Sequence, residues 1–283
     1  GSGFALHFLD VGQGDGAVLR TPKGRWILID AGPVNEAGDA GGRVVAPFLQ
    51  RHGARGLALA FVSHAHADHL GGVLTVLRRF RPGEVVEPGE QVADPLYYGF
   101  LNGLSAQAIP WHAGARGEHF TLDSLDFTIL HPDRHWSRWG EDLNEDSLVL
   151  LIRYGDFEVV FAGDAGFPAE REMRGLTCRV DLLKVGHHGS RGSTGEEWLD
   201  ALHPTGAIIS VGHNNYGHPS PETLSRLRHH GIAVWRTDQD GTVTVTTDGR
   251  QMTIRSPRGI ETYDVRDPAG SSSSTGEVPC KRP

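Results

Sequence analysis

Residues 63–72 read SHAHADHLGG and place three histidines and one aspartate within six positions. They follow the apolar run LALAFV, which predicts a short strand buried on both faces. In extended backbone, His64, His66 and Asp68 point to one side, whereas His69 points elsewhere. One loop can therefore supply two adjacent metal ions. His64 and His66 would bind the first ion, and Asp68 and His69 the second.

Further Asp and His residues follow later apolar runs, at the carboxyl ends of predicted strands, where α/β folds place their ligand sites. Asp164 ends the run EVVFAGD, and His187 and His188 follow RVDLLKVG. His218 lies in NNYGHP, after the run AIISVG. A carboxylate such as Asp164 can bridge two ions. Imidazole and carboxylate ligands suit Zn(II), Fe(II) or Mn(II) alike, so the ligand types do not decide which metal binds.

Composition narrows the function classes. The net charge of −8 and the pI of about 6.0 argue against a broad basic face that grips a polyanion. Cys178 and Cys280 form neither a zinc-type pair at short spacing nor a disulfide scaffold, so a metal site must use His and carboxylate. No run approaches the ~20 apolar residues of a membrane span.

The elements that must position these residues alternate between hairpins and βα units. A short turn, Gly155-Asp156, predicts a type II′ hairpin, and residues 81–118 give no clear pattern. Two mixed sheets packed together with helices outside, in one domain, fit this order. Strands are predicted at 4–11, 17–21, 25–32, 57–63, 125–131, 147–154, 157–164, 179–185, 207–211, 233–237, 242–246 and 251–255, and helices at 43–52, 69–80, 195–202 and 221–230.

The ends of the chain differ in composition from its middle. Residues 1–3, Gly-Ser-Gly, are expected to be an expression scar. Residues 4–263 are expected to form the folded domain. Residues 264–283 are rich in Ser, Gly and Pro, which predicts a disordered tail.

The motif H-x-H-x-D-H followed by Gly-Gly resembles the signature of the metallo-β-lactamase superfamily, which implies a four-layer αββα sandwich. Further strings are similar to the soluble hydrolase domain of ComEC/Rec2-type competence proteins, and the resemblance covers about residues 4–256. These strings are LDVGQGD (9–15), IDAG (29–32), NEDSLVL (144–150), FAGD (161–164), LKVGHHGS (183–190) and SVGHNNYGHP (210–219).

The resemblance implies a ligand set. It places His64 and His66 on the first metal. Asp68 and His69 fall on the second, with Asp164 bridging. A histidine of the HHGS string should complete the second site, and either His187 or His188 fits. The other one would face substrate.

One position departs from the superfamily pattern. Many members have a histidine as the third ligand of the first metal, where this chain has Asn144. The first metal is therefore expected to be weakly held, rich in water or completed by substrate. This favours a harder ion such as Mn(II) over simple zinc stoichiometry.

Several polar residues have two interpretations. Asp30, in IDAG, either caps a turn or matches the superfamily aspartate that orients metal-ligand histidines. Asp15 is either a turn residue or an acid close to the metals. Ser190, Asn215 and His218 either contact phosphate or make ordinary hydrogen bonds within their loops.

The resulting hypothesis is a binuclear metal-dependent hydrolase that uses two divalent transition-metal ions, Mn(II) or Zn(II). A bridging hydroxide would be the nucleophile, and Asp68, His188 and His218 are the candidate catalytic residues. The resemblance implies a phosphodiester substrate, single-stranded DNA degraded during uptake, bound weakly. The alternatives are a hydrolase of the phosphorylcholine-esterase, lactonase or β-lactamase type, or an inactive, metal-stabilised interaction domain.

Relatives of this kind carry the hydrolase domain on a membrane channel, at the outer face of the cytoplasmic membrane. The chain is either such a domain, excised, or a free-standing relative. A scar directly before the strand that begins at Phe4 favours excision, and an excised domain is expected to be a monomer.

Overall fold

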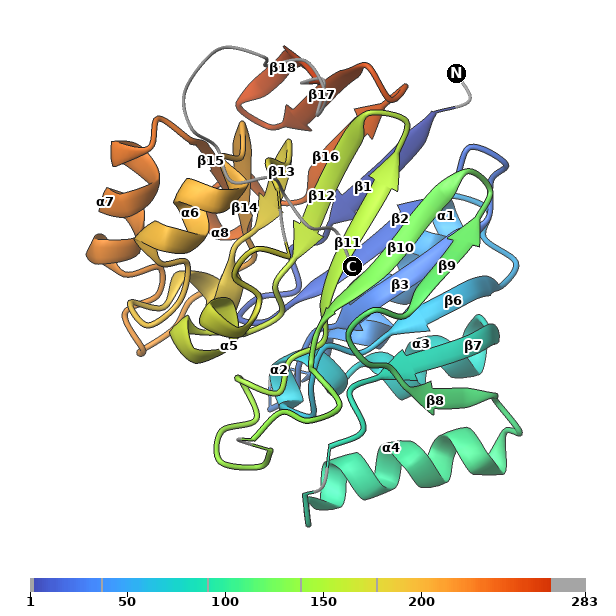
Figure 1. The fold of residues 1–283 in the computed structure, drawn as a ribbon. Helices are drawn as coiled ribbons and strands as arrows, with labels where there is room; N and C mark the ends of the chain where they lie inside the picture. Colours follow the sequence, from blue (N-terminus) through green and yellow to red (C-terminus); the bar gives the residue numbers. More distant parts are fainter. Residues whose placement is uncertain (1–2, 37, 91, 138, 177, 266–283) are drawn as a thin grey trace.

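The computed structural model describes residues 3–36, 38–90, 92–137, 139–176 and 178–265 (Figure 1). Two large sheets dominate this part of the chain. The first has the strand order β18-β17-β16-β1-β2-β3-β6-β7-β8 and the second β15-β14-β13-β12-β11-β10-β9. Both are mixed, because hairpins form one part of each sheet and parallel strands the other.

The strands of the first sheet come from both ends of the chain. They are β1 (Phe4–Phe8), β2 (Gly16–Arg20), β3 (Trp26–Ala31), β6 (Leu57–Phe61), β7 (Pro82–Glu87), β8 (Trp111–Ala113), β16 (Val243–Thr247), β17 (Gln251–Ser256) and β18 (Gly259–Asp264). A small hairpin, β4 (Val34–Asn35) and β5 (Gly38–Asp39), follows β3.

The second sheet is built from the middle of the chain. It holds β9 (His119–Leu122), β10 (Leu125–His131), β11 (Val149–Tyr154), β12 (Phe157–Phe161), β13 (Leu182–Lys184), β14 (Gly206–Ile209) and β15 (Ala233–Arg236). The helices are η1 (Gly41–Val45, a π-helix), α1 (Ala46–Arg51), α2 (Ala67–Leu70), α3 (Val73–Arg79), α4 (Pro95–Ala106), α5 (Phe167–Glu172), η2 (Gly186–Gly189, a 3₁₀ turn), α6 (Glu196–Leu202), α7 (Pro221–His229) and α8 (Thr237–Asp240).

Three buried clusters show how the layers pack. In β2, Leu19 joins the cluster between the two sheets, whereas Val18 joins the cluster beneath α1, α3 and α4. This alternation is what a strand buried on both faces requires. Phe8 stacks on Phe161 across the sheets, with ring centroids 5.4 Å apart. A third cluster packs the second sheet against α5, α6 and α7. The predicted αββα sandwich is confirmed.

The structure divides the predicted helix 69–80 into α2 and α3. A Cβ atom at Gly72 would lie 2.4 Å from the Ala31 carbonyl oxygen and 2.5 Å from the Gly41 nitrogen. The chain therefore needs glycine here, because the end of β3 and the start of η1 press directly on the backbone. This packing places the motif loop against the end of β3.

Helix α4 lies in the stretch 81–118, which had no predicted structure. Its start carries a recognisable signal, because the Asp94 side chain accepts hydrogen bonds from Leu96 N and Tyr97 N, with Pro95 next to it. Gly99 and other weak helix formers in its interior hide the helical pattern.

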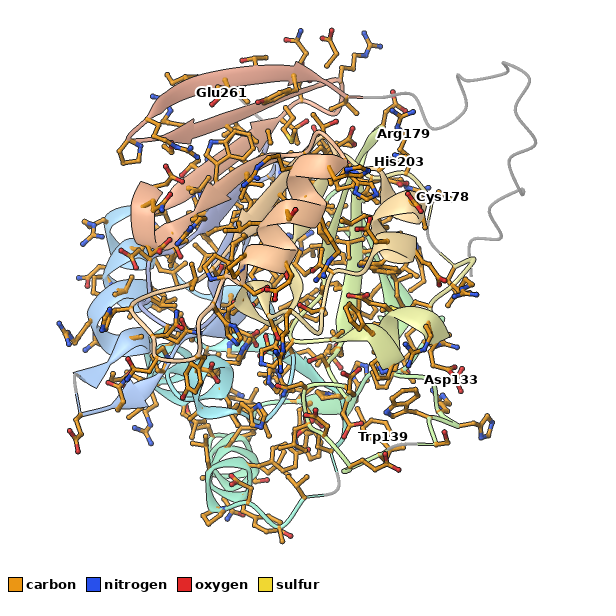
Figure 2. All side chains as sticks on the ribbon, turned by 90° about the vertical axis from the view of Figure 1, so that its left-hand side faces the viewer. Asp133, Trp139, Cys178, Arg179, His203 and Glu261 are labelled. Atoms are coloured by element: carbon orange, nitrogen blue, oxygen red, sulfur yellow. The ribbon has the colours of Figure 1, made fainter. Side chains whose placement is uncertain are left out.

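Strand β18 was also missed. It pairs with β17 at the edge of the first sheet and is largely exposed, so it lacks alternating apolar residues. Figure 2 shows Glu261 on this outer strand. Of the predicted scar at 1–3 only Gly3 is described, and of the predicted tail at 264–283 only Asp264, the last residue of β18, and Val265 are described. Residues 1–2 and 266–283 lie outside the described residues.

Strand β13 is held in place beside the end of α6. Val180 N donates to Leu202 O over 2.8 Å. Figure 2 shows Arg179 close to His203, the residue that ends α6 with a left-handed φ of 38°. In the part of the chain that is described, no helix has the length and apolar character needed to cross a bilayer.

Candidate metal centre

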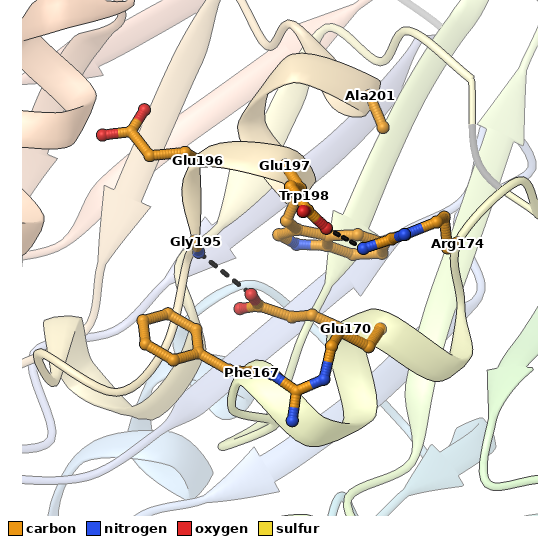
Figure 3. A pocket seen from close by; sticks show the side chains of 9 residues that line it. Phe167, Glu170, Arg174, Gly195, Glu196, Glu197, Trp198 and Ala201 are labelled. Atoms are coloured by element: carbon orange, nitrogen blue, oxygen red, sulfur yellow. Dashed lines mark hydrogen bonds and ion pairs between the residues drawn. The ribbon is translucent and has the colours of Figure 1, made fainter.

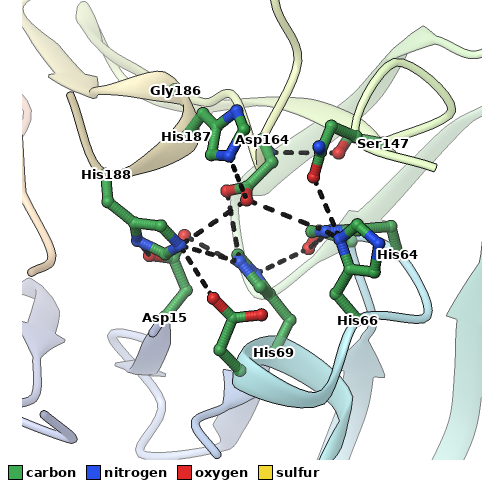
Figure 4. Close-up of polar contacts among 12 residues, drawn as sticks. Asp15, His64, His66, His69, Ser147, Asp164, Gly186, His187 and His188 are labelled. Carbon is green, nitrogen blue, oxygen red and sulfur yellow. Dashed lines mark hydrogen bonds and ion pairs between the residues drawn. The ribbon is translucent and has the colours of Figure 1, made fainter. Parts of the chain in front are cut away.

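The metal-ligand candidates gather where the loops after β6, β12 and β13 meet (Figure 4). His64 follows β6, Asp164 follows β12, and His188 lies in η2 after β13. His64 and His188 are at most 1% exposed, and Asp164 is 2% exposed. Parallel strands end at the same edge of a sheet, and these loops bring both sheets' strand ends together.

One group of ligand atoms surrounds the Nε2 atoms of His69 and His188, which lie 3.3 Å apart. Asp68 Oδ2 is 3.2 Å from His188 Nε2. Asp164 Oδ1 is 3.1 Å from His69 Nε2, and its Oδ2 is 3.5 Å from His188 Nε2. This is the set expected for the second metal.

A second group of ligand atoms surrounds His66 Nδ1. It lies 3.0 Å from His64 Nε2 and 3.0 Å from Asn144 Oδ1. Asp164 Oδ2 is 3.8 Å from His64 Nε2. Asp164 therefore reaches both groups, and Asn144 presents its amide oxygen at the group around His66, which is the set expected for the first metal.

Asp30 and Ser63 set the protonation of two imidazoles. Ser63 Oγ donates its proton to Asp30 Oδ2 over 2.6 Å, so toward His64 Nδ1, 3.0 Å away, it acts as the acceptor. His69 Nδ1 lies 3.1 Å from the same hydroxyl. Asp30 Oδ2 also lies 2.9 Å from His69 Nδ1 and accepts its proton. Both rings then turn an Nε2 lone pair inward, as metal ligands must. Asp30 therefore has the position expected of the residue that orients metal-ligand histidines. The adjacent Ser63 was not singled out from the sequence.

His188 is oriented by a different pair. Its Nδ1 donates to Ser210 O over 2.9 Å and lies 3.2 Å from Asp15 Oδ1. Lys184 Nζ holds the other Asp15 oxygen at 2.7 Å. Asp15 is therefore an acid close to the metal centre. The buried Lys184 was missed, although a charged residue inside the apolar run LLKV was a signal that it needs a partner.

These donors fit divalent metal ions. The Nε2 lone pairs and the carboxylates of Asp68 and Asp164 are all acceptors, and they converge on the same points. Asp164 Oδ1 is buried and, among the residues described, receives no well-formed hydrogen bond. In each of two sets of three side chains, the ligand atoms lie within 4.8 Å of one another. The first set is Asp15, His69 and His188, and the second is His64, His69 and Asp164. Acceptors that converge in a buried site require a cation between them, either a proton or a metal ion.

The electrostatics agree with this requirement. Burial lowers the pKa of His188, but Asp164, Asp15 and Asp68 outweigh it and raise that pKa to about 10. Burial and the nearby His69 hold the pKa of His64 well below its ordinary value. Burial opposes ionisation of Asp164, yet the neighbouring imidazoles hold its pKa well below the usual range. The carboxylates are thus ionised at neutral pH and ready to bind metal.

The HHGS turn separates its two histidines. His187 and His188 have φ values of 47° and 51°, in the left-handed region that residues with a side chain rarely adopt. His188 enters the buried cluster. His187 stays 31% exposed, with Nε2 3.8 Å from Asp164 Oδ2. This geometry favours His188 over His187 as the ligand candidate and leaves His187 at the mouth of the candidate site.

The remaining candidates lie around this mouth. The His218 ring is 5.4 Å from the His187 ring, and burial together with the nearby His187 lowers the pKa of His218. Ser190 Oγ accepts a hydrogen bond from Gly192 N, which is a contact within its own loop. Asn215 is exposed in the loop that carries His218.

Glu90 supports the motif loop and was not found from the sequence. Both of its carboxylate oxygens accept from Ala65 N, at 3.1 and 3.2 Å. Ala65 lies between the first two histidines of the motif. Burial, with Asp146 and Glu87 nearby, raises the pKa of Glu90 to about 8. Glu90 is therefore largely protonated at neutral pH.

A separate cavity of about 240 Å³ lies between α5 and α6 (Figure 3). Phe167 and Trp198 line it, and the Glu170 carboxylate accepts from Gly195 N over 2.9 Å. Burial raises the pKa of Glu170 to about 7. The metal-ligand candidates do not line this cavity, so it is distinct from the metal centre.

The family model for the metallo-β-lactamase superfamily matches residues 9–213, which include the motif, Asp164 and His188. The chain belongs to this superfamily. The predicted departure at Asn144 lies within the matched residues.

Among curated proteins, the chain is 31% identical over 277 residues to ComE operon protein 3 of Bacillus subtilis, covering 93% of this chain and 35% of that protein. It is 32% identical over 251 residues to Recombination protein 2 of Haemophilus influenzae, covering 88% of this chain and 30% of that protein. It is 31% identical over 241 residues to Competence protein ComA of Neisseria gonorrhoeae, covering 84% of this chain and 31% of that protein. The chain spans about a third of the length of these relatives.

Solved structures share the fold. The diiron β-hydroxylase CmlA of Streptomyces venezuelae has a TM-score of 0.60 at 19% identity, covering 87% of this chain and 54% of that chain. The metallo-hydrolase Igni18 of Ignicoccus hospitalis has a TM-score of 0.55 at 17% identity, covering 85% of this chain and 98% of that chain. These similarities concern the fold, because one fold carries many reactions.

Proposed function

We propose that the protein is a binuclear metal-dependent phosphodiesterase that degrades single-stranded DNA. The observation that carries this proposal is the position of Asp164, 3.8 Å from His64 Nε2 and 3.1 Å from His69 Nε2. Two divalent ions would lower the pKa of a shared water molecule and neutralise charge on a phosphate. The proposed ligands are His64 and His66 at the first ion, Asp68, His69 and His188 at the second, and Asp164 at both.

The choice of substrate rests on the relatives and on the mouth of the site. The similar proteins are named for competence and recombination, both of which handle DNA. His187 and His218 stand at the mouth, where their ring nitrogens can donate hydrogen bonds to phosphate oxygens. The net charge of −8 predicts weak DNA binding that depends on the added charge of the metals.

Metal analysis and two variants test the reaction class. We expect one to two transition-metal ions per purified chain. His64→Ala and Asp68→Ala should abolish turnover while circular dichroism still reports a fold. His119→Ala is the matched control, because this half-exposed histidine lies on the edge strand β9. Full activity of the His64→Ala or Asp68→Ala variant would rule out the proposed site.

A side-by-side assay tests the substrate. Single-stranded DNA, a bis-aryl phosphodiester and a cephalosporin are each incubated with protein supplied with Mn(II) or Zn(II). We expect cleavage of the DNA and the aryl diester. Turnover of the cephalosporin without DNA cleavage would support a different hydrolase. Metal binding without turnover of any substrate would support an interaction domain.

The setting of the domain is part of the same proposal. The chain covers about a third of each relative's length, which supports a hydrolase domain that works within a longer protein. We infer a membrane channel as the remainder, with this domain on its extracytoplasmic face, and a monomeric state for the chain alone. Light scattering that shows a stable dimer at micromolar concentration would contradict the monomer.

A further inference from the structure

Tyr216 stands at the mouth of the metal centre and is the most exposed large hydrophobic side chain among the described residues, at 77%. It lies in the loop that links β14 to α7 and carries His218. A single exposed aromatic ring is ordinary on a protein surface. Two further observations make this one different.

The loop around Tyr216 is held rigidly. Asn214 Nδ2 donates to Gly212 O over 2.9 Å and to His218 O over 2.8 Å. Asn214 Oδ1 accepts from Tyr216 N and His218 N, both at 3.1 Å. Gly212 N in turn donates to Gln13 Oε1 over 3.2 Å. These bonds fix the backbone on both sides of Tyr216, so the loop holds the ring outward.

The ring also belongs to a continuous row that leads to the metals. Tyr216 stacks on His218, with centroids 5.9 Å apart and planes 28° apart. His218 packs against His187 with centroids 5.4 Å apart, and His187 Nε2 is 3.8 Å from Asp164 Oδ2. Three aromatic rings thus lead from the surface to the proposed bridging carboxylate.

We propose that Tyr216 is a stacking platform for a nucleobase of single-stranded DNA, next to the phosphate that is cut. This inference rests on the proposed nuclease function and names the part of the site that selects its substrate. An acidic protein gains little from the phosphate contacts that usually dominate DNA affinity. Base stacking on an aromatic ring supplies affinity without net charge and accepts every base.

The test compares base-bearing and abasic substrates. Metal-loaded wild type, Tyr216→Ala and Tyr216→Trp are assayed on a single-stranded oligonucleotide and on the same oligonucleotide with abasic residues around one central phosphate. Tyr216→Ala should raise the KM for the base-bearing strand by about 5- to 100-fold and leave the KM for the abasic strand unchanged. Tyr216→Trp should restore the wild-type KM. Tyr98→Ala, which removes a 54% exposed ring from α4, is the matched control and should change neither.

Each outcome decides the question. Equal KM values for wild type and Tyr216→Ala, or an equal loss on both strands, would overturn the proposal. Fluorescence anisotropy with the same labelled strands gives a second readout that needs no cleavage. If wild type cuts no DNA, the nuclease proposal fails. A binding difference between base-bearing and abasic strands that Tyr216→Ala removes would still support the platform, and its absence would overturn it.

Discussion

His69 Nε2 and His188 Nε2 lie 3.3 Å apart, and in both rings a contact at Nδ1 leaves Nε2 to face the candidate metal site. Asp30 accepts the Nδ1 proton of His69, and Ser210 O accepts that of His188. Two lone pairs that face each other need a proton or a metal ion between them. In the metal-free protein His188 carries this proton, because the ionised carboxylates of Asp164, Asp15 and Asp68 raise its pKa to about 10 despite its burial.

Metal binding should therefore release protons. Below about pH 10 the metal must displace a proton from His188, so metal affinity should rise with pH up to that value. We expect about one to two protons released per chain loaded at pH 7.5. Isothermal titration calorimetry in buffers of different ionisation enthalpy measures this number. A binding heat that is independent of the buffer would contradict this arrangement.

Asn144 should set the affinity of the first ion. Its Oδ1 atom lies 3.0 Å from His66 Nδ1, and the family resemblance predicts a histidine ligand at this position. Asn144→Ala should weaken binding of the first ion on the order of 10-fold, and Asn144→His should tighten Zn(II) binding. Competition with a chromogenic chelator gives both constants. The same first-site affinity in wild type and Asn144→Ala would show that this side chain is not a ligand.

The sequence predicts the metal-ligand cluster because the pattern is local. H-x-H-x-D-H lies in one loop, and the later candidates follow apolar runs whose ends must meet at one edge of a sheet. The choice between His187 and His188 could not be made, because it depends on two left-handed φ angles in one turn. Helix α4 and the exposed strand β18 were missed because neither has a clear apolar period.

The supporting residues were harder to predict, because each contacts a segment far away in the sequence. Lys184 binds Asp15, and Glu90 binds the motif loop at Ala65. A buried charge in an apolar strand indicates that a partner exists but does not say which one. Only the packed sheets bring these pairs together.

Glu90 should make stability depend on pH. Its pKa is raised from 4.5 to about 8, chiefly by burial, so the folded state keeps a proton that the unfolded chain loses between these values. The free energy of unfolding should therefore fall as the pH rises from about 4.5 to 8. Glu90→Gln mimics the protonated form and removes this contribution.

Urea unfolding of wild type and Glu90→Gln measures the effect. The free energies of unfolding of the two proteins should differ little at pH 5. At pH 9 that of Glu90→Gln should exceed that of wild type by on the order of 3 kcal/mol. Glu172→Gln serves as the control, because this glutamate is exposed at the end of α5. A constant difference between wild type and Glu90→Gln across the pH range would exclude a protonated Glu90.

Lys184 should be needed for both stability and the second ion. Its Nζ atom lies 2.7 Å from Asp15 Oδ2, with both side chains buried. Burial opposes the ionised carboxylate, but Lys184 together with His69 and His188 outweighs it and lowers the pKa of Asp15. Lys184→Met leaves that carboxylate buried without its partner, which should cost about 3–5 kcal/mol of unfolding free energy. Because Asp15 Oδ1 is also 3.2 Å from His188 Nδ1, the metal affinity of the second site should fall too.

The double variant Lys184→Met, Asp15→Asn separates the charge effect from lost packing. It removes both charges, so it should recover most of the stability lost in Lys184→Met alone. Urea unfolding of the four proteins gives the coupling energy, and metal content after dialysis reports the second site. Losses that simply add would show that the two charges do not interact. A Lys184→Met protein as stable as wild type would mean that Asp15 is protonated or solvated in the native state, and the pair would then have no part in orienting His188.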